Sequence, residues 1–537
     1  FTADLHSSAL KRIEDVSFLR NTQFKEDSGP TSHPVKPKEY ISIDNFYTTT
    51  IYEKGAEIIR MLQTLLGQSN FLSGIKEYVE TYDGSAATTE DFVNSILKGA
   101  TKNGYKSTFS IIQFNRWYYQ AGTPKVTIER DWDSSNNKLI LKISQIQSSN
   151  STSINAPLII PIKLSILNSV NTKEENLIIL DRAKQTFTFK NVITQNEIPI
   201  VSVFRNFSAP VSFNTDLNLN ELIYISENDD DIFARWDTLN FLTRQALLQR
   251  SIGKANTKIE SLLIKSLENN IIEYKHKQPE FISKILTIPN LAELELYQNP
   301  INPIQLNKAH IHFKSLLGKS LENHLIPLLA ECNNKCHEKW PRGKGYRSLI
   351  EVIWSLLIIN GHEDIRKELV KSITCSSMTL SKSALNALIP IECKERDDSL
   401  KLFYNKWKSN PIVLDSWFNI QASIERKNSI AFIERLLTHD LYDPFAPNSI
   451  RAVLGGFTKN INSFHSIDGE GYDFLVNQII DVDRRNPITA SRLLKIFNQW
   501  DKYIEPNKKM MKKSLNRMNE NNLSSNTKEI LNLILNQ

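Results

Sequence analysis

Residues 45–61 read NFYTTTIYEKGAEIIRM, and this stretch decides how the first part of the chain folds. Thr50 is followed three residues later by Glu53, a capping-box pattern that predicts a helix with Thr50 as its N-cap. Tyr52 then occupies the second helical position, beside unpaired backbone N–H groups and the positive end of the helix dipole. A phenol held there could donate to an oxyanion that develops during a reaction. From spacing alone, a half-buried ring that simply packs is the commoner reason for such a tyrosine.

Length and composition limit the class of protein. A chain of 537 residues predicts several domains, and 40% hydrophobic with 23% charged residues is typical of globular proteins. No run of eighteen apolar residues exists, which argues against a membrane span. The net charge of +6 is spread over 65 basic and 59 acidic residues, so we expect no nucleic-acid partner. Four cysteines, and a start (FTADLHSSALKRI) without a long apolar core, predict a cytoplasmic location.

Three parts follow one another along the chain. Residues 1–121 are expected to be helical and rich in loops, with a second helix over 91–100 and prolines at 30, 34 and 37. From residue 123 the hydrophobic period changes to that of strands, which predicts a small β-sandwich over 122–213. The strand-length pieces are 138–145, 158–167, 186–192 and 200–213.

Residues 214–537 give one amphipathic segment after another. Segment 234–249 places Trp236, Leu239, Leu242 and Ala246 on one side, and segment 347–361 ends at Asn360-Gly361. Such strings form stacked helical pairs, and no strict repeat period is present. We therefore expect an irregular, HEAT-like superhelical stack.

Several longer stretches carry a resemblance to a known family. They are QFKEDSGPTSHPVKP (23–37), IDNFYTTTIYEKGAEIIRMLQTLLG (43–67), YDGSAATTEDFV (82–93), FNRWYYQAGTP (114–124), FSAPV (207–211), SFHSIDGEGYDFL (463–475) and RRNPITASRLL (484–494). In this order they resemble the zinc-dependent aminopeptidase N family of gluzincins, especially bacterial alanyl aminopeptidases. The resemblance implies a multidomain α+β fold, in which residues 1–121 are the helical tail of a thermolysin-like catalytic domain.

The resemblance also implies a function and a set of site residues. The chain would be the C-terminal portion of a zinc metallo-aminopeptidase that hydrolyses N-terminal residues from peptides. Tyr52 falls on the family's oxyanion-stabilising tyrosine. Asp44 and Tyr47 would line pockets beside the scissile bond, although the family commonly carries asparagine where Asp44 stands. Arg451 and Arg492 would face the substrate cavity, with Ile488 standing where a polar residue is expected.

The metal-binding motif of the family is not found in this sequence. None of the ten histidines forms H-E-x-x-H, and the amine-binding G-x-M-E-N segment is absent too. We expect the zinc ligands and general base to lie in a missing N-terminal catalytic half, so that this chain alone is inactive and the complete enzyme is monomeric. Cys332, Cys336, His337, Cys375 and Cys393 have poor ligand spacing and are expected to be ordinary thiols and a histidine. His33 is expected to be a hydrogen-bonded loop histidine.

A different class of function stays open at this point. The chain could be a non-catalytic helical scaffold or degenerate relic that binds a partner protein. Exposed apolar surface within residues 1–121 is expected under either hypothesis. An H-E-x-x-H segment encoded in frame before Phe1 would favour the enzyme.

Overall fold

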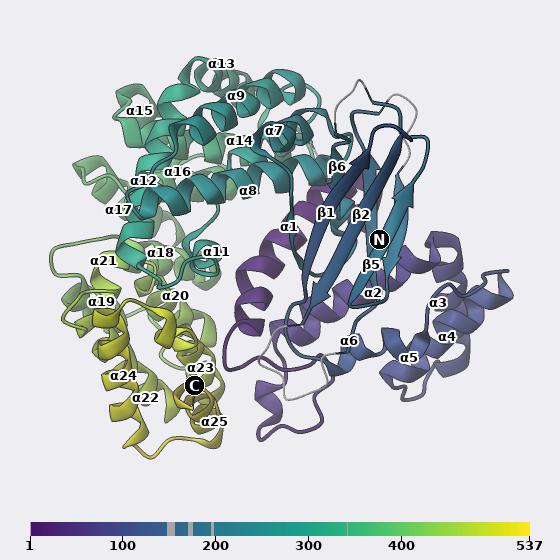
Figure 1. Cartoon of the computed structure of the whole chain (residues 1–537). Coiled ribbons are helices and arrows are strands. Elements are labelled where there is room, and N and C mark those ends of the chain that lie inside the picture. The colour runs from purple at the N-terminus through teal and green to yellow at the C-terminus, as the bar shows by residue number, and fades with distance from the viewer. Residues whose placement is uncertain (1, 148–155, 170–174, 195–197, 341, 537) are drawn as a thin grey trace. The chain divides into compact units, whose positions relative to one another are not determined.

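The computed structural model describes residues 2–147, 156–169, 175–194, 198–340 and 342–536. The chain divides into two compact units. Unit 1 contains residues 1–40 and 46–238, and unit 2 contains residues 41–45 and 239–537, so the second boundary falls inside helix α8 (Ile232–Ser251). Figure 1 shows the strands grouped in one part of unit 1 and helices in the rest of the chain. No helix among the described residues is long and apolar enough to cross a membrane.

Unit 1 begins with helices. They are α1 (Thr2–Asp27), the π-helical turn η2 (Thr50–Lys54), α2 (Gly55–Leu66), α3 (Gln68–Tyr82), α4 (Thr89–Lys102), α5 (Ile111–Phe114) and α6 (Arg116–Tyr119). Helix α4 contains the helix predicted over 91–100 and begins with a capping box between Thr88 and Asp91. Helices α3 and α4 approach closely because glycines face each other: a Cβ on Gly99 would lie 2.7 Å from the Cα of Gly74.

Two sheets follow, as the strand-length pieces predict. Their strands are β1 (Lys125–Asp133), β2 (Lys138–Ile146), β3 (Ile160–Ile166), β4 (Asn176–Leu180), β5 (Lys184–Phe189), β6 (Val201–Val203) and β7 (Ser212–Thr215). One sheet has the order β5-β2-β1-β7 and the other β4-β3-β6. Strands β1 and β2 pair antiparallel with Ile128 opposite Ile143, whereas β7 runs parallel to β1 with Phe213 opposite Val126.

One sequence prediction about these strands is wrong. The piece 200–213 is not a single strand, because β6 and β7 belong to different sheets. A 3₁₀ turn, Arg205–Phe207, separates them, and Phe204 and Asn206 there have positive φ angles of 52° and 53°. The left-handed backbone turns the chain from one sheet to the other.

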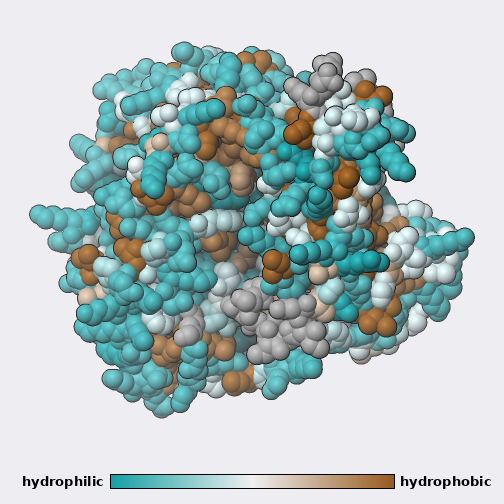
Figure 2. Space-filling model, viewed as in Figure 1, coloured by the Kyte–Doolittle hydropathy of each residue, from teal (hydrophilic) through white to brown (hydrophobic). Residues whose placement is uncertain are grey.

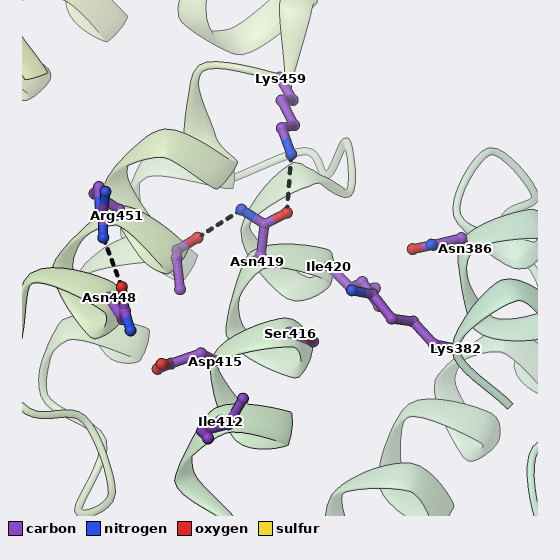
Figure 3. A pocket seen from close by; sticks show the side chains of 11 residues that line it. Lys382, Asn386, Ile412, Asp415, Ser416, Asn419, Ile420, Asn448, Arg451 and Lys459 are labelled. Atoms are coloured by element: carbon purple, nitrogen blue, oxygen red, sulfur yellow. Dashed lines mark hydrogen bonds between the residues drawn. The ribbon is translucent and has the colours of Figure 1, made fainter. Parts of the chain in front are cut away.

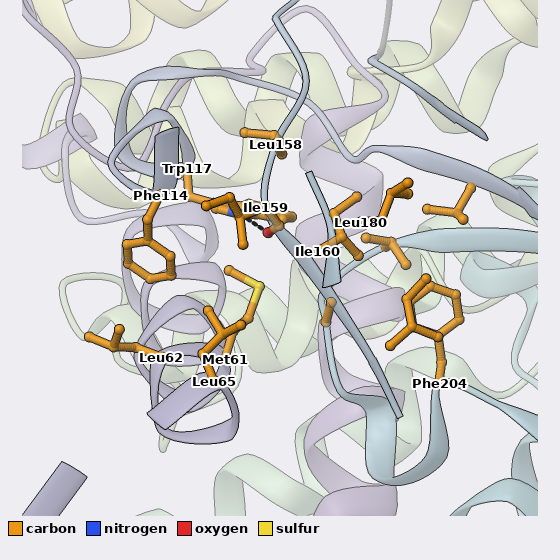
Figure 4. Packing of buried hydrophobic residues seen from close by; sticks show 14 of the residues in the cluster. Met61, Leu62, Leu65, Phe114, Trp117, Leu158, Ile159, Ile160, Leu180 and Phe204 are labelled. Atoms are coloured by element: carbon orange, nitrogen blue, oxygen red, sulfur yellow. Dashed lines mark hydrogen bonds between the residues drawn. The ribbon is translucent and has the colours of Figure 1, made fainter. Parts of the chain in front are cut away.

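The helices and the sheets of unit 1 share one hydrophobic core. Figure 4 shows Met61, Leu62 and Leu65 of α2 packing beside residues of the sandwich. Trp117 is almost completely buried, and its indole N–H donates to the carbonyl oxygen of Ile159 at 2.8 Å. The start of the chain is therefore fixed to the sandwich by a common core. After it come α7 (Leu219–Asn228) and the first two turns of α8.

Unit 2 is helical. Its helices are α9 (Thr257–Tyr274), α10 (Pro279–Leu286), α11 (Leu291–Glu295), α12 (Pro303–Ser320), α13 (Glu322–Lys335), α14 (Arg342–Leu357), α15 (Glu363–Ser372), α16 (Met378–Leu388), α17 (Lys394–Trp407), α18 (Pro411–Ser423), α19 (Ser429–Leu437), α20 (Pro447–Phe457), α21 (Ile461–Phe464), α22 (Glu470–Asp483), α23 (Pro487–Leu494), α24 (Glu505–Asn519) and α25 (Ser525–Leu535). Short 3₁₀ turns are η1 (Ile43–Asn45), η4 (Ile358–Asn360), η5 (Lys495–Phe497) and η6 (Trp500–Lys502). The expected all-α part and the multidomain α+β class are confirmed.

Asparagine-proline pairs start several of these helices. In α12, α18 and α23 the asparagine side chain is the N-cap and accepts the backbone N–H three residues on, while proline takes the first helical position. The two helices singled out from the sequence are also present. The predicted side of α8 is buried, and the segment ending at Asn360 stops at Gly361, whose φ is +82°.

Apolar side chains are exposed in the first part of the chain, as the sequence predicts. On the face drawn in Figure 2, hydrophobic residues form several brown groups among hydrophilic ones. Large exposed hydrophobic residues before position 121 are Phe18, Tyr40, Ile41, Ile43, Tyr47, Tyr52, Ile59, Leu72, Val79, Ile112 and Tyr119.

Candidate active site around Tyr52

Tyr52 lies on the π-helical turn that leads into α2. Its side chain is 60% exposed, and no described residue forms a hydrogen bond with its hydroxyl group. The backbone N–H of Gly55 reaches back to the carbonyl oxygen of Thr50, the wide spacing of a π turn. The phenol is therefore an unused donor at the beginning of a helix, which is the arrangement that oxyanion stabilisation requires.

The predicted capping box between Thr50 and Glu53 is wrong. Glu26, at the end of α1, takes that place: its Oε2 accepts from the hydroxyl of Thr49 at 2.9 Å, the hydroxyl of Thr50 at 2.8 Å and the backbone N–H of Thr50 at 3.0 Å. One carboxylate satisfies three donors and places negative charge at the positive end of the helix. Glu53 does not cap. Burial, with a smaller contribution from Asp15, raises the pKa of its carboxyl group.

His33 forms a hydrogen bond with Thr48, the first of the same three threonines. Its Nδ1 is 2.8 Å from the carbonyl oxygen of Pro34, so this nitrogen carries the proton and donates. Nε2 then accepts from the hydroxyl of Thr48 at 2.9 Å, and the backbone N–H of Ile51 donates to the same Thr48 oxygen. His33 is the hydrogen-bonded loop histidine that the sequence predicts.

Two buried ion pairs anchor the turn after Tyr52. Lys54 donates to Asp27 at 3.1 Å and to the carbonyl oxygen of Gly122 at 2.8 Å. Arg12 forms a bidentate pair with Glu57 and also donates to the carbonyl oxygen of Phe207 at 3.1 Å. These contacts fix the turn between α1 and the start of the sandwich, so the direction of Tyr52 is set by long-range contacts.

Sequence reasoning did not single out Glu26 and Asp27. The feature of the sequence that could have indicated them is the acidic pair in QFKEDSG, which ends at the Gly29-Pro30 turn. Buried acids of this kind need partners from elsewhere in the chain.

Tyr47 is the second candidate residue in this place. Its ring lies 6.4 Å from that of Tyr52, centroid to centroid, with 26° between the planes. Phe46 and Tyr40 continue the ring contacts at 5.9 Å and 5.7 Å. The four residues form an aromatic strip in unit 1, of which Tyr40, Tyr47 and Tyr52 are more than half exposed.

Asp44 lies in unit 2, on the turn η1. The amide nitrogen of Asn526 donates to its carboxylate at 3.3 Å. The neighbouring Asn45 accepts from the hydroxyl of Ser491 at 3.2 Å and donates to Glu529 at 2.8 Å. Turn η1 therefore packs on α23 and α25.

The two candidate arginines are exposed on neighbouring helices of unit 2. Arg451 of α20 donates to the carbonyl oxygen of Pro447 at 3.1 Å and to Asn448 at 2.6 Å. Arg492 of α23 forms no hydrogen bond or ion pair with a described residue. Helices α20 and α23 pack against each other, and Ser491 ties α23 to η1. Arg492 thus has an unused guanidinium near Asp44's turn, and Ile488 is half-buried.

The described residues of the chain offer no suitable set of ligands for a metal ion. Within the described ranges, no group of three histidine, cysteine, aspartate or glutamate side chains is arranged to hold one. Burial raises the pKa of the Cys332 thiol to about 12, which disfavours the thiolate that a metal needs. Cys336 is also buried, and its thiol donates to the carbonyl oxygen of Asn333 at 3.3 Å.

Comparisons with known proteins cover nearly the whole chain. Three family models match the chain one after another. They are the peptidase family M1 domain (residues 4–117), a domain of unknown function with an Ig-like fold (122–216) and a domain of unknown function with ARM repeats (219–536). Aminopeptidase N of Caulobacter vibrioides is 32% identical over 98% of this chain and 61% of that protein. Aminopeptidase N of Escherichia coli is 30% identical over 96% of this chain and 60% of that protein.

A solved structure agrees with these matches. Legionella pneumophila aminopeptidase A, crystallised in complex with aspartic acid, aligns with a TM-score of 0.82 at 26% identity. The alignment covers 95% of this chain and 59% of that one. The present chain thus spans about three fifths of the length of the relatives that it matches.

Proposed function

We propose that this chain, which belongs to peptidase family M1, is the C-terminal portion of a metallo-aminopeptidase that removes residues one at a time from the N-termini of peptides. The support for the activity is the similarity to aminopeptidases over almost the whole chain. The support for a catalytic contribution from this portion is the exposed, unused hydroxyl of Tyr52.

Tyr52 is proposed to donate a hydrogen bond to the oxyanion that forms when water attacks the first peptide bond. A donor at such an oxygen contributes about 3 kcal/mol, or roughly a hundredfold in rate, when it is already in position. Glu26, Lys54 and His33 supply that positioning: Glu26 and His33 bind the threonines before the phenol, and Lys54, two residues after it, ties the turn to Asp27. These three are positioning residues, and only Tyr52 would touch the reacting atoms.

Four other residues are proposed to contact the substrate. The exposed ring of Tyr47 offers an apolar surface beside the phenol of Tyr52. The carboxylate of Asp44 would favour basic side chains. The guanidinium groups of Arg451 and Arg492 would bind peptide carbonyls or a distal carboxylate, which orients a peptide without reading its sequence.

The zinc ligands are proposed to belong to residues outside this chain. The described residues offer no set of ligands, whereas family M1 is generally zinc-dependent. The chain alone is therefore proposed to hydrolyse nothing. We further propose that the complete enzyme is monomeric and cytoplasmic, in line with four free thiols, and that the parts 1–121, 122–213 and 214–537 are its domains.

The proposal is tested by adding a separately produced catalytic half that carries H-E-x-x-H. We expect release of 4-nitroaniline from an alanyl substrate only when both halves are present. Activity of this chain by itself would overturn the zinc assignment. A mixture that binds together but cleaves nothing would overturn the enzyme hypothesis and favour the scaffold.

A further inference from the structure

Helices α16, α18 and α20 of unit 2 surround a cavity of about 500 Å³. Its volume lies in the range of small-ligand sites in proteins. Its lining includes three cationic side chains, Lys382, Arg451 and Lys459, but only one acidic side chain, Asp415. Figure 3 shows these groups around Asn419, from α16, α18, α20 and the turn after α20.

None of the three cations is paired with a carboxylate of the described residues. Lys459 donates to the amide oxygen of Asn419 at 3.0 Å, and Arg451 donates to neutral oxygens. Lys382 forms no hydrogen bond or ion pair within the described ranges. Burial, with a further contribution from Lys382, lowers the pKa of Lys459. Both ammonium groups line the same cavity, and an anion bound between them would offset their like charge.

Asp415 has no cationic partner either. No described residue donates to its carboxylate or pairs with it. Burial, and then the nearby Asp443, raises the pKa of this group, and none of the three cations of the lining pairs with it. A ligand with an ammonium group would supply one.

The spacing along α18 gives the length of the ligand. Asp415 lies one turn before Asn419, whose amide oxygen accepts a hydrogen bond from Lys459. Four residues of helix correspond to a rise of about 6 Å. Two residues of extended peptide span about 7 Å. The side chains of Ile412 and Ile420 add apolar surface to the lining of the cavity.

We propose that this cavity binds a short zwitterionic peptide, with its carboxylate against Lys382 and Lys459 and its ammonium group against Asp415. The site refines the substrate contact proposed above for Arg451, and to that extent rests on the proposed function, but its charges stand independently of Tyr52. Arg451 lies across Asn419 from Lys382 in Figure 3 and keeps one guanidinium nitrogen for a peptide carbonyl, since its other two donate within α20.

Calorimetry on the 537-residue chain at low salt tests the proposal with Ala-Ala, Ala-Ala amide and N-acetyl-Ala-Ala. Charge-assisted hydrogen bonds predict that amidation of the C-terminus weakens binding by about tenfold or more. Equal affinity for the acid and the amide would overturn the carboxylate assignment. This comparison needs no variant and therefore does not depend on how a variant folds.

Variants then locate the site. Lys382→Gln combined with Lys459→Gln should weaken Ala-Ala binding by about tenfold or more, whereas Lys408→Gln, on the exposed end of α17, should change it less than about twofold. Asp415→Asn should weaken Ala-Ala but leave N-acetyl-Ala-Ala unchanged. If the double variant binds as the Lys408 control does, the cavity is not the site. If Asp415→Asn affects both ligands equally or neither, its pairing with the ammonium group is wrong.

These outcomes are distinct from those of the proposed function. Loss of Tyr52 chemistry would not alter calorimetric binding in unit 2. Conversely, failure of Ala-Ala to bind would leave the assay with the added catalytic half unaffected.

Discussion

The ammonium group of Lys54 donates to the carboxylate of Asp27 at 3.1 Å, and both side chains are almost completely buried. The hydroxyl of Thr123 also donates to Asp27, at 2.9 Å. This pair joins the turn that carries Tyr52 to the end of α1 and to the entry of the sandwich. The position of the phenol thus depends on charges that lie far apart in the sequence.

Lys54→Met should destabilise the protein strongly. It leaves the carboxylate of Asp27 buried without its charge partner, which costs about 3 to 5 kcal/mol of unfolding free energy. Urea denaturation measures this loss. Lys142→Met, which breaks the exposed pair with Asp131, serves as the control and should shift the midpoint far less. Equal shifts for the two variants would show that the buried pair has no special role.

Glu26→Gln should loosen the start of the helix more than it loosens the rest of unit 1. The amide keeps the shape but removes the charge that faces three donors and the helix dipole, a loss of about 1 to 2 kcal/mol. Hydrogen exchange should rise in peptides covering residues 48–55 and stay unchanged in strand β2. Unchanged exchange at 48–55 would contradict the capping role of Glu26.

Stability should fall as pH rises from about 4 to about 6 because of Asp231. Burial, and then Asp229, raises the pKa of this carboxyl group to about 6 in the folded chain. A raised folded pKa means that the folded state binds the proton more tightly, so protonation stabilises the fold and ionisation removes that stability. The carboxylate accepts the backbone N–H of Phe233 at the start of α8.

Asp231→Asn tests this effect, because asparagine can still cap the helix. The stability of the variant relative to the parent should rise by about 1 to 3 kcal/mol between pH 4 and pH 7.5, whereas the loss of the acceptor for the backbone N–H of Asn206 acts at both pH values. Asp364→Asn, at a fully exposed position, should show no such pH-dependent difference. A constant difference across pH would contradict the raised pKa.

The cysteines should differ in reactivity. Burial raises the pKa of the Cys332 thiol to about 12, whereas Cys375 and Cys393 are partly exposed. At pH 7.5 iodoacetamide should therefore label Cys375 and Cys393 first and leave Cys332 unlabelled in the folded chain. Mass spectrometry of tryptic peptides reads the result. Rapid labelling of Cys332 would mean that its part of α13 opens readily.

The architecture could be predicted where local pattern decides it. Alternating apolar residues in β2 and helical spacing in α8 and α14 appear directly in the sequence. Strand β1 was not singled out, because its centre reads ERD and only two of its residues are fully buried. Its place is fixed by pairing with β2 and β7, which no local window contains.

The candidate site could be predicted only in part, because some of its contacts come from distant parts of the sequence. The residue Tyr52 follows from the resemblance, and its exposure agrees with a role at the surface of a site. The capping of the turn η2 could not be predicted from the local sequence, because its acceptor, Glu26, belongs to the preceding helix α1. Glu53, three residues after Thr50, has the spacing of a capping box and therefore suggested the wrong partner. The roles of Asp44, Tyr47, Arg451 and Arg492 stay predictions.

The turnover of Tyr52→Phe, in this chain combined with a catalytic half that carries the zinc ligands, tests the central claim most directly. Phenylalanine keeps the ring and removes only the donor, so kcat should fall by about a hundredfold with KM nearly unchanged. Tyr40→Phe, at an exposed tyrosine to which no substrate contact is assigned, is the matched control and should keep its kcat. If Tyr52→Phe turns over as fast as the parent, Tyr52 does not stabilise the oxyanion.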